Sequence, residues 1–243
     1  MILGLIPSRL GSTRLKKKPL LEINGLPIII HTLKRAKLSK RLTKIIVCTD
    51  SKEIMDMVKK HGGDCVITSK KHNNGTERIN EVAKKYNPKL VIDIQGDEPL
   101  LDPTHIDKVI SHHQKNTHYD IILPNLKFKA SKSENIVKVV SDKNDKVLYL
   151  SRSQIPFPFK VKPKFYKKHL SIISFKPKAL KKFCSFKQSE LEKIEGIELI
   201  RALENNIQIG TFSLSSNTFS VDIKDDYLRA IKAFKKDKFR NAY

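Results

Sequence analysis

The sequence predicts an α/β fold with a mainly parallel, twisted sheet flanked by helices. In the first 120 residues, short runs rich in β-branched residues alternate with amphipathic stretches, an order typical of right-handed crossovers between parallel strands. The runs are apolar throughout, as expected for strands buried on both faces. With 243 residues, 39% of them hydrophobic and 30% charged, the chain can bury a substantial core.

Four strands and three helices are expected in this first part. The third helical stretch shows the clearest pattern, because Ile79, Val82, Ala83 and Tyr86 recur at the i, i+3, i+4, i+7 spacing of an amphipathic helix. The predicted strands cover residues 2–6, 44–49, 65–68 and 90–94, and the predicted helices cover 28–37, 51–61 and 75–86.

Beyond about residue 120 the pattern changes to shorter strand-like segments. A basic loop at 155–168, interrupted by three prolines, separates them, and two helices close the chain. We find no internal repeat and no linker long enough for two independent domains, so a single domain over residues 1–243 with a strand-rich insertion is predicted. The strands are expected at 120–124, 137–140, 147–150, 169–175 and 208–212, and the helices at 189–204 and 224–235.

The formal net charge of +23 raises the question of nucleic-acid binding. The lysines are spread over the candidate helices, and we find no zinc finger, RNP-like aromatic motif or basic region with heptads. A solvated, lysine-rich surface is therefore the preferred interpretation, with no specific nucleic-acid partner. Such a surface could still help to recruit polyanionic substrates.

Neither a membrane span nor a disulfide framework is expected. No apolar run approaches the roughly 18 residues of a transmembrane helix, and the short apolar start is interrupted by Arg9. Cys48, Cys65 and Cys184 are scattered and form no metal-binding pattern. We expect a cytoplasmic protein.

A basic loop follows the first predicted strand, where open parallel sheets bind their ligands. The segment from Ser8 to Lys18 contains five cations within ten residues, together with Gly11 and hydroxyl groups at Ser12 and Thr13. Arginine can grip phosphate oxygens bidentately, and lysine supplies a compact charge. The spacing fits neither a Rossmann nor a P-loop motif. A solvated turn is the alternative, but the position favours a triphosphate site.

Two aspartates could supply hard oxygen ligands for Mg²⁺ near this loop. Asp97 follows the buried strand at 90–94 within a Gly-Asp-Glu-Pro turn, and Asp222 closes an extended segment before the last helix. Asp97 could also be a simple turn former. Asp225 and Asp226 are interpreted as first-turn residues that complement the helix dipole.

Together these segments resemble the 3-deoxy-manno-octulosonate (Kdo) cytidylyltransferases, and more distantly the CMP-sugar synthetases that act on neuraminate-like acids. The resemblance extends over nearly the whole chain, with the motifs in the same order. The matching segments are IPSR at 6–9, STRL at 12–15, KPL at 18–20, NGLP at 24–27, VCTD at 47–50, GTER at 75–78, QGDEP at 95–99, NIVK at 135–138, YLSR at 149–152, IP at 155–156, HL at 169–170, LEKIE at 191–195, Glu198, Arg201 and VD at 221–222.

The resemblance implies that the anomeric hydroxyl of a 2-keto-3-deoxy sugar acid attacks the α-phosphorus of CTP, with Mg²⁺ as cofactor and pyrophosphate as leaving group, for lipopolysaccharide or other cell-surface glycan synthesis. It also implies a homodimer, a nucleotide-binding part over about 1–120, a sugar-binding and dimerisation part over about 121–212, and a C-terminal metal segment and helix over 213–243. The implied catalytic residues are Arg14, Lys18 and Asp97; the nucleotide-binding residues are Pro7, Ser8, Arg9, Gly11, Ser12, Arg14, Lys18 and Gly75; the metal ligands are Asp97 and Asp222; and the sugar-binding residues are Arg78, Gln95, His169, Ile173, Glu198 and Leu199.

The sequence departs from the family pattern on the sugar side. Ile173 stands where the family usually has Tyr, and Leu199 where it usually has Gln. Both changes remove hydrogen-bonding groups. Three hypotheses remain: activation of Kdo itself; the same chemistry on a modified Kdo or a nonulosonic acid, which Ile173 and Leu199 suggest; and a non-catalytic binder of nucleic acid or anionic surfaces, which the net charge of +23 suggests.

Overall fold

The computed structural model describes residues 1–11, 14–129, 133–215 and 218–243. The chain forms two compact units. The first comprises Met1–Lys108 together with Asn217–Tyr243, and the second comprises Val109–Ser216. The boundary falls within helix α4 (Pro103–Lys115). The sequence prediction of one domain over residues 1–243 stays a prediction.

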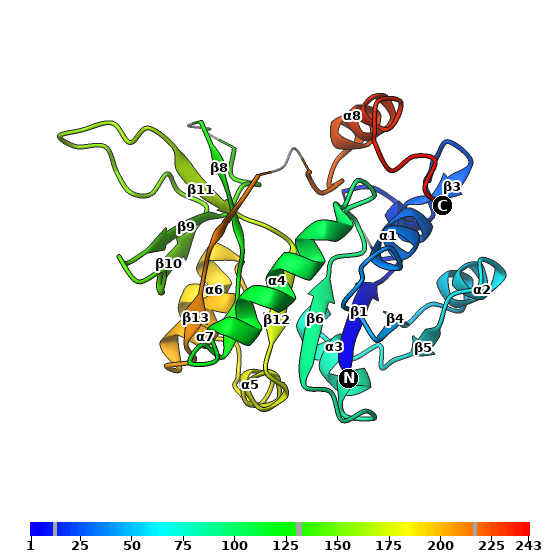
Figure 1. The fold of residues 1–243 in the computed structure, drawn as a ribbon, viewed down its shortest axis with the longest axis horizontal. Coiled ribbons are helices and arrows are strands. Elements are labelled where there is room, and N and C mark those ends of the chain that lie inside the picture. The colour runs from blue at the N-terminus through cyan, green and yellow to red at the C-terminus, as the bar shows by residue number, and fades with distance from the viewer. Residues whose placement is uncertain (12–13, 130–132, 216–217) are drawn as a thin grey trace. The chain divides into compact units, whose positions relative to one another are not determined.

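Four paired, parallel strands form the centre of the first unit (Figure 1). Their order is β6-β1-β4-β5, and β1 pairs with both β4 and β6. This confirms the predicted α/β class with a mainly parallel sheet. All five residues of β6 are buried, as the apolar run suggested. The strands are β1 (Ile2–Ser8), β4 (Lys44–Thr49), β5 (Cys65–Ile67) and β6 (Leu90–Ile94).

Helices cover both faces of this sheet. In Figure 1, α1 lies in front of the strands and α3 behind them. Helix α8 closes the unit by burying Ala230 and Phe234 against Ile23, Ile28 and Val221. The helices are α1 (Ile28–Ala36), α2 (Lys52–Lys60), α3 (Gly75–Ala83) and α8 (Lys224–Phe234); the 3-10 turn η1 (Lys18–Leu20) and the hairpin of β2 (Glu22–Ile23) with β3 (Leu26–Pro27) precede α1.

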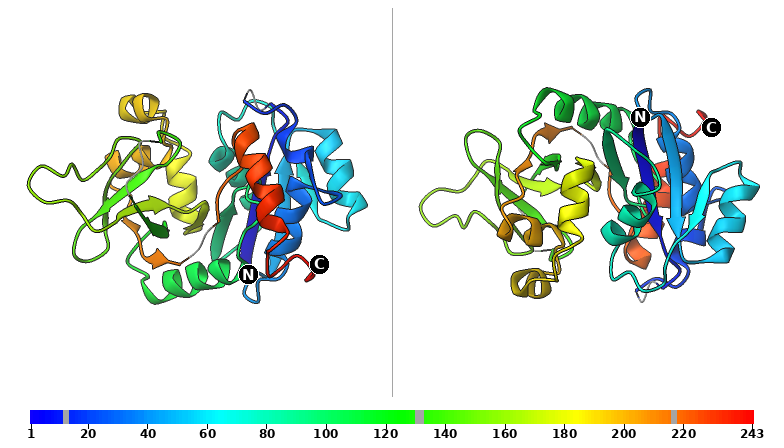
Figure 2. Two further views of the ribbon diagram at one scale, coloured as in Figure 1. Left: turned by 90° about the horizontal axis from the view of Figure 1, so that it is seen from above. Right: turned by 90° about the horizontal axis from the view of Figure 1, so that it is seen from below.

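The second unit contains a five-stranded sheet of order β10-β9-β11-β8-β14 (Figure 2). Three further strands of this unit also pair, with β7 between β13 and β12. The prediction of a strand-rich second part is therefore confirmed, although several strands are only two residues long. The strands are β7 (Ile121–Ile122), β8 (Asn125–Phe128), β9 (Lys138–Ser141), β10 (Val147–Ser151), β11 (Tyr166–His169), β12 (Ile172–Phe175), β13 (Ile209–Gly210) and β14 (Ser213–Leu214).

Two elements of this unit were predicted to be continuous, but each is divided into two in the structure. The expected strand over 169–175 is two strands, because β11 ends at His169 and β12 begins at Ile172. The expected helix over 189–204 is also interrupted. Gly196 ends α6 with a φ of 61°, a left-handed conformation that favours glycine, and α7 starts three residues later. The helices are α5 (Pro177–Phe183), α6 (Glu190–Glu195) and α7 (Leu199–Glu204).

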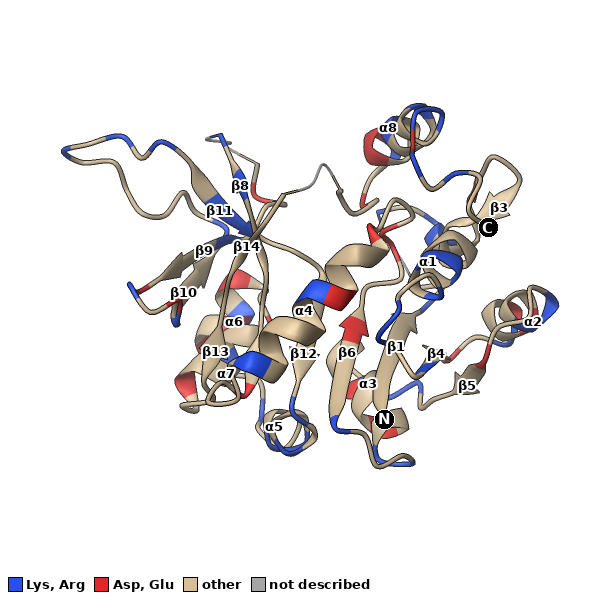
Figure 3. Ribbon diagram, viewed as in Figure 1, with Lys and Arg blue, Asp and Glu red and all other residues tan. Residues whose placement is uncertain are grey.

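Basic side chains occur throughout both units. Figure 3 shows Lys and Arg on strands, helices and loops of each unit rather than along one element. This distribution agrees with a solvated, lysine-rich surface. Within the described parts of the chain, no helix combines the length and the apolar character that a membrane span needs.

Candidate functional site

The end of β1 brings together two other segments that the sequence singled out. The start of α3 packs against Pro7, since a Cβ atom built on Gly75 would lie 3.2 Å from the Pro7 ring. The turn after β6 also lies close to this strand end, where a Cβ on Gly96 would lie 2.9 Å from the Pro7 carbonyl oxygen. A side chain cannot fit at Gly96 without a backbone shift, so glycine here lets the Asp97 turn reach the end of β1.

The loop after β1 begins with a buried hydroxyl group. Ser8 is 8% exposed, and its Oγ has no hydrogen-bond partner within the described residues. Arg9 and Gly11 follow at the surface. Ser12 and Thr13 lie outside the described residues, so the predicted role of Ser12 stays a prediction. A buried hydroxyl without a partner is costly, which favours a role for Ser8 in holding a ligand.

The two predicted metal ligands converge on one lysine. The Nζ atom of Lys18 lies 2.6 Å from Oδ2 of Asp97 and 3.3 Å from Oδ1 of Asp222. The main chain joins the two acidic segments as well, because the Val221 N–H donates to the Asp97 carbonyl at 2.9 Å. Residues separated by 79 and 204 positions in the sequence are thus neighbours around a single cationic group.

Arg14 completes this group of charges. Its Nη2 lies 3.0 Å from Oδ1 of Asp222, and its side chain is 55% exposed. Asp226 lies in the first turn of α8 as predicted, and its carboxylate also accepts the backbone N–H groups of Asp222 and Ile223. This hydrogen bonding fixes the main chain of Asp222 at the start of the helix.

Two cations and two carboxylates therefore occupy one patch of the first unit. Carboxylate oxygens are suitable ligands for Mg²⁺, and guanidinium and ammonium groups bind phosphate. The described residues contain no group of three or more His, Cys, Asp or Glu side chains that could hold a metal ion. A pair of carboxylates still suits Mg²⁺ next to a nucleotide, because this ion usually keeps several water and phosphate ligands.

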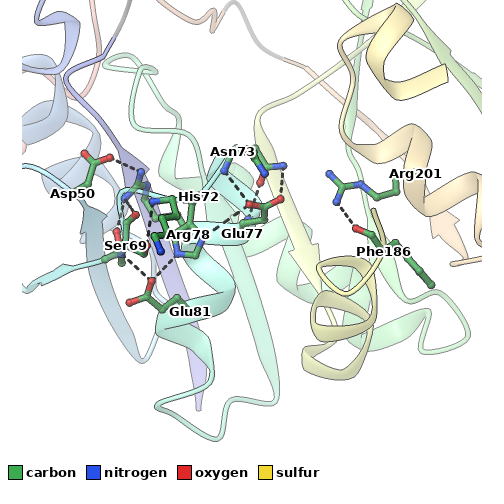
Figure 4. Close-up of polar contacts among 12 residues, drawn as sticks. Asp50, Ser69, His72, Asn73, Glu77, Arg78, Glu81, Phe186 and Arg201 are labelled. Atoms are coloured by element: carbon green, nitrogen blue, oxygen red, sulfur yellow. Dashed lines mark hydrogen bonds and ion pairs between the residues drawn. The ribbon is translucent and has the colours of Figure 1, made fainter. Parts of the chain in front are cut away.

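Arg78 lies in a buried network between the ends of β4 and β5 (Figure 4). Its Nη2 lies 2.7 Å from Oδ2 of Asp50, and its Nη1 donates to Thr68. The side chain is 4% exposed. These contacts hold α3 against the sheet edge. The sugar-side role predicted for Arg78 stays a prediction.

The segment leading into α3 is fixed by two glutamates of that helix (Figure 4). Glu81 accepts from the Ser69 N–H at 3.0 Å and lies 2.6 Å from Nε2 of His72. Glu77 accepts from the Asn73 N–H at 2.9 Å. Hydrogen bonding and the nearby imidazole lower the pKa of Glu81 despite the opposing effect of burial. Gly75 therefore follows a well-anchored loop.

Gln95 is the second sugar-side candidate in this unit. Its Nε2 donates to Oδ2 of Asp93 at 2.9 Å, so the side-chain amide is oriented by a carboxylate within β6. This contact uses one of the donors of the amide and leaves its carbonyl oxygen as an acceptor. The predicted contact of Gln95 with the sugar stays a prediction.

The other sugar-side candidates belong to the second unit. His169 is the last residue of β11, and its buried Nδ1 has no hydrogen-bond partner among the described residues. Burial first, and then the nearby charges of Arg152 and Lys168, lower the pKa of His169 to about 4. The imidazole is therefore neutral near pH 7 and a weak base. A role in contacting substrate fits this environment better than a role as proton acceptor.

Ile173 and Leu199 are buried apolar residues of the second unit. They lie on β12 and at the first position of α7, and they are 7% and 6% exposed. Glu198 directly precedes α7. A buried ion pair between Glu192 and Arg201 joins α6 to α7, so it holds the segment that carries Glu198 and Leu199.

The sequence predicted no function for two cations of the second unit, the buried Lys138 and the partly exposed Arg152. Lys138 is 1% exposed, and its Nζ donates to the carbonyls of Ser133 at 3.0 Å and Arg152 at 2.5 Å. Burial lowers the pKa of Lys138. Arg152 donates from Nε to the Glu195 carbonyl at 2.7 Å. The position of Lys138 between two valines in the sequence could have indicated that this lysine is buried.

Comparison with known proteins identifies the family. A family model described as cytidylyltransferase matches residues 3–209. A 3-deoxy-manno-octulosonate cytidylyltransferase from Nitratiruptor sp. is 40% identical over 237 residues, covering 94% of this chain and 98% of that protein. The protein of the same name from Fusobacterium nucleatum is 38% identical over 244 residues and covers 98% of both chains. The chain belongs to the 3-deoxy-manno-octulosonate cytidylyltransferase family.

One solved structure agrees with this assignment, and a second shares the fold. The structure of a CMP:2-keto-3-deoxy-manno-octonic acid synthetase complexed with CTP has a TM-score of 0.91 at 29% identity and covers 97% of this chain and 98% of its own. A cytidylyltransferase from Leptospira borgpetersenii, at 18% identity and a TM-score of 0.67, shares the fold. Membership in the cytidylyltransferase family makes the protein a nucleotidyltransferase enzyme, as two of the three hypotheses require.

Proposed function

We propose that the protein transfers CMP from CTP to 3-deoxy-manno-octulosonate for lipopolysaccharide synthesis. The anomeric oxygen of the sugar forms a bond to the α-phosphorus, the bond from that phosphorus to the bridging oxygen breaks, and pyrophosphate leaves. The hydroxyl proton passes to water. The observation that carries the proposal is the convergence of Lys18, Asp97 and Asp222 in a chain of this family.

In this mechanism the cations after β1 bind the triphosphate. Arg9, Arg14 and Lys18 neutralise its charge, and the buried Ser8 hydroxyl donates a hydrogen bond to an oxygen of the nucleotide. Gly75 at the start of α3 lets the nucleotide approach the backbone beside Pro7. Catalysis then rests on positioning and on charge neutralisation rather than on a protein nucleophile.

The cofactor that we propose is Mg²⁺, held by Asp97 and Asp222. Both carboxylates already lie within 3.3 Å of one cationic group, so they can converge on a single ion. When bound, Mg²⁺ would orient the α-phosphate and neutralise charge that develops on the phosphates. The two aspartates otherwise remain fixed by the main-chain hydrogen bond between their segments.

The direct test is release of pyrophosphate with CTP, Mg²⁺ and Kdo. We expect turnover that requires all three components and is much faster with CTP than with UTP, ATP or GTP. Omission of the sugar supplies the control for simple CTP hydrolysis. Absence of pyrophosphate release at millimolar Kdo would contradict the proposal.

A second candidate keeps the chemistry and changes the acceptor. Ile173 and Leu199 are buried and offer no hydrogen bond to a sugar hydroxyl, which favours a modified Kdo or a nonulosonic acid. A hydroxyl group left unpaired on burial costs about 1–3 kcal/mol. Comparing kcat/KM for a panel of 2-keto-3-deoxy acids separates the candidates. If the second candidate is right, kcat/KM for the altered sugar should exceed that for Kdo by roughly 5–150-fold, the ratio that corresponds to about 1–3 kcal/mol.

We also propose a homodimer that forms through the second unit. The segment between β10 and β11 projects from its sheet in Figure 1 and exposes Phe157, Phe159 and Val161 at 77–83% of their surface. Exposed aromatic side chains of this kind are typical of protein interfaces. Sedimentation velocity should show a dimer, and Phe157→Ser combined with Phe159→Ser should shift it towards monomer.

We propose a cytoplasmic location for the protein, because the proposed reaction depends on CTP.

A further inference from the structure

The ammonium group of Lys18 contacts both carboxylates that we propose as metal ligands. It contacts a carboxylate oxygen of Asp97 at 2.6 Å and one of Asp222 at 3.3 Å. Its side chain is 14% exposed, less than the 26% of each carboxylate. Lys18 is thus the inner cation of this group and the direct partner of both aspartates.

The backbone of Lys18 is fixed, while its side chain can move. The Lys18 N–H donates to the Leu15 carbonyl at 3.2 Å, and the Leu21 N–H donates to the Lys18 carbonyl at 3.2 Å. Pro19 is buried directly after it. Four rotatable bonds separate the ammonium group from this anchored backbone, so it can exchange one anionic partner for another without a change in the fold.

The four side chains that contact one another here carry no net charge in the absence of nucleotide. Asp97 and Asp222 contribute two negative charges, and Lys18 and Arg14 contribute two positive charges. A divalent ion that joined this group would be repelled by an ammonium ion at contact distance from the same oxygens. A triphosphate that arrives with the metal supplies a new anionic partner for Lys18.

We propose that Lys18 serves as a resident counter-ion of the Asp97–Asp222 pair and leaves it for the triphosphate when metal and nucleotide bind together. The inference rests on the proposed function for the identity of the ligands. Its consequence is that the nucleotide-free protein binds divalent cations weakly, and that nucleotide and metal each strengthen binding of the other. Lys18 then prevents the carboxylates from holding a metal ion without substrate.

Lys17 provides a matched control next to it in the chain. Its Nζ lies 2.9 Å and 3.1 Å from the two carboxylate oxygens of Glu53, and its side chain is 63% exposed. It belongs to the same loop and carries the same charge, but its partner is not one of the proposed metal ligands. Replacing Lys17 tests whether loss of a positive charge anywhere in the loop is sufficient to raise metal affinity.

The experiment measures Mn²⁺ binding to the full chain by electron paramagnetic resonance, without nucleotide or sugar. Removing the ammonium in Lys18→Met should raise Mn²⁺ affinity by at least about tenfold, within the usual range for coupled sites. Lys17→Met should change it less than twofold, and Lys18→Arg should keep the weak binding. Adding Asp97→Asn to Lys18→Met should abolish the gain. Equal affinity of wild type and Lys18→Met would overturn the proposal.

A second measurement keeps the test decisive if Lys18→Met is poorly folded, as judged by circular dichroism. In the wild type, CTP should raise Mn²⁺ affinity by about tenfold or more, and in Lys18→Gln this increase should be several times smaller. The same increase in both proteins would overturn the proposal. A wild type that binds CTP and Mn²⁺ cooperatively but releases no pyrophosphate with any sugar acid would contradict the proposed function and leave the role of Lys18 intact.

Discussion

The buried ion pair of the second unit should be much more important for stability than an ion pair of similar geometry at the surface. Glu192 accepts two hydrogen bonds of 2.7 Å from the Arg201 guanidinium, and both side chains are at most 3% exposed. Arg201 also donates to the Phe186 carbonyl at 3.0 Å, which Figure 4 shows. Glu192→Gln keeps the size of the side chain and removes its charge, leaving a buried guanidinium without its anionic partner.

The loss of stability expected for Glu192→Gln follows from the burial of this ion pair. Loss of one partner from a buried pair costs about 3–5 kcal/mol. For a chain of this size, each kcal/mol lowers the melting temperature by about 2–4 °C, so Glu192→Gln should lower it by at least about 6 °C. The matched surface variant is Glu53→Gln, which loses the contact with Lys17 where the side chains are 63% and 48% exposed. Its effect should be below about 1 kcal/mol.

Thermal and urea unfolding of the two variants and the wild type provide the assay. Because the Glu192–Arg201 pair holds the segment with Glu198 and Leu199, the KM for the sugar should also rise in Glu192→Gln at a temperature where the variant is folded. The KM for CTP should change little. Similar melting temperatures for Glu192→Gln and Glu53→Gln would refute the reasoning.

Three further predictions concern the site and the pH dependence. Asp97→Asn should lower kcat by about 10²–10³-fold in the pyrophosphate assay while the protein stays folded, and near-wild-type turnover would argue against its role. Gly96→Ala places a Cβ 2.9 Å from the Pro7 carbonyl oxygen, so both the melting temperature and kcat should fall, whereas an unchanged variant would show that the turn can move freely. Burial lowers the pKa values of His113 and His169 to about 4. The unfolded chain binds a proton at each histidine below about pH 6.5, whereas the folded protein does so only near pH 4, so the free energy of unfolding falls as the pH is lowered from 6.5 towards 4. Replacing each histidine with Asn should flatten the stability profile between pH 6.5 and 4, and an unchanged slope would contradict this assignment.

The first unit was predictable because its strands are buried on both faces. A strand such as β6 must be apolar along its whole length, and this run is visible without any tertiary information. The helix α4 was missed although Pro103 at its start and the apolar Ile106, Val109 and Ile110 gave a usable signal.

The second unit was harder to predict for physical reasons. Strands of two residues, such as β7 and β13, are too short to show a period, and their pairing depends on residues distant in the sequence. The interruption at Gly196 depends on one left-handed residue. Glycine occurs in many conformations, so its presence alone did not predict the end of α6.

The candidate site also combines features that the sequence predicts with features that it does not. Its basic loop and both aspartates could be found from residue type and position, because ligands bind beyond the carboxyl ends of parallel strands. The bridging position of Lys18 could not be found in this way. It depends on contacts with Asp97 and Asp222 across 79 and 204 residues, and on the approach of Gly96 to Pro7.

The central claim is that this chain joins CMP to an acidic sugar at the Lys18, Asp97 and Asp222 site. Phosphorus NMR of wild type and Asp97→Asn with CTP, Mg²⁺ and Kdo tests it most directly. With wild type, the three CTP resonances should give way to one phosphodiester resonance and to pyrophosphate, and with Asp97→Asn they should persist over the same time. Unchanged CTP with wild type, or the same product from both proteins, would contradict the claim.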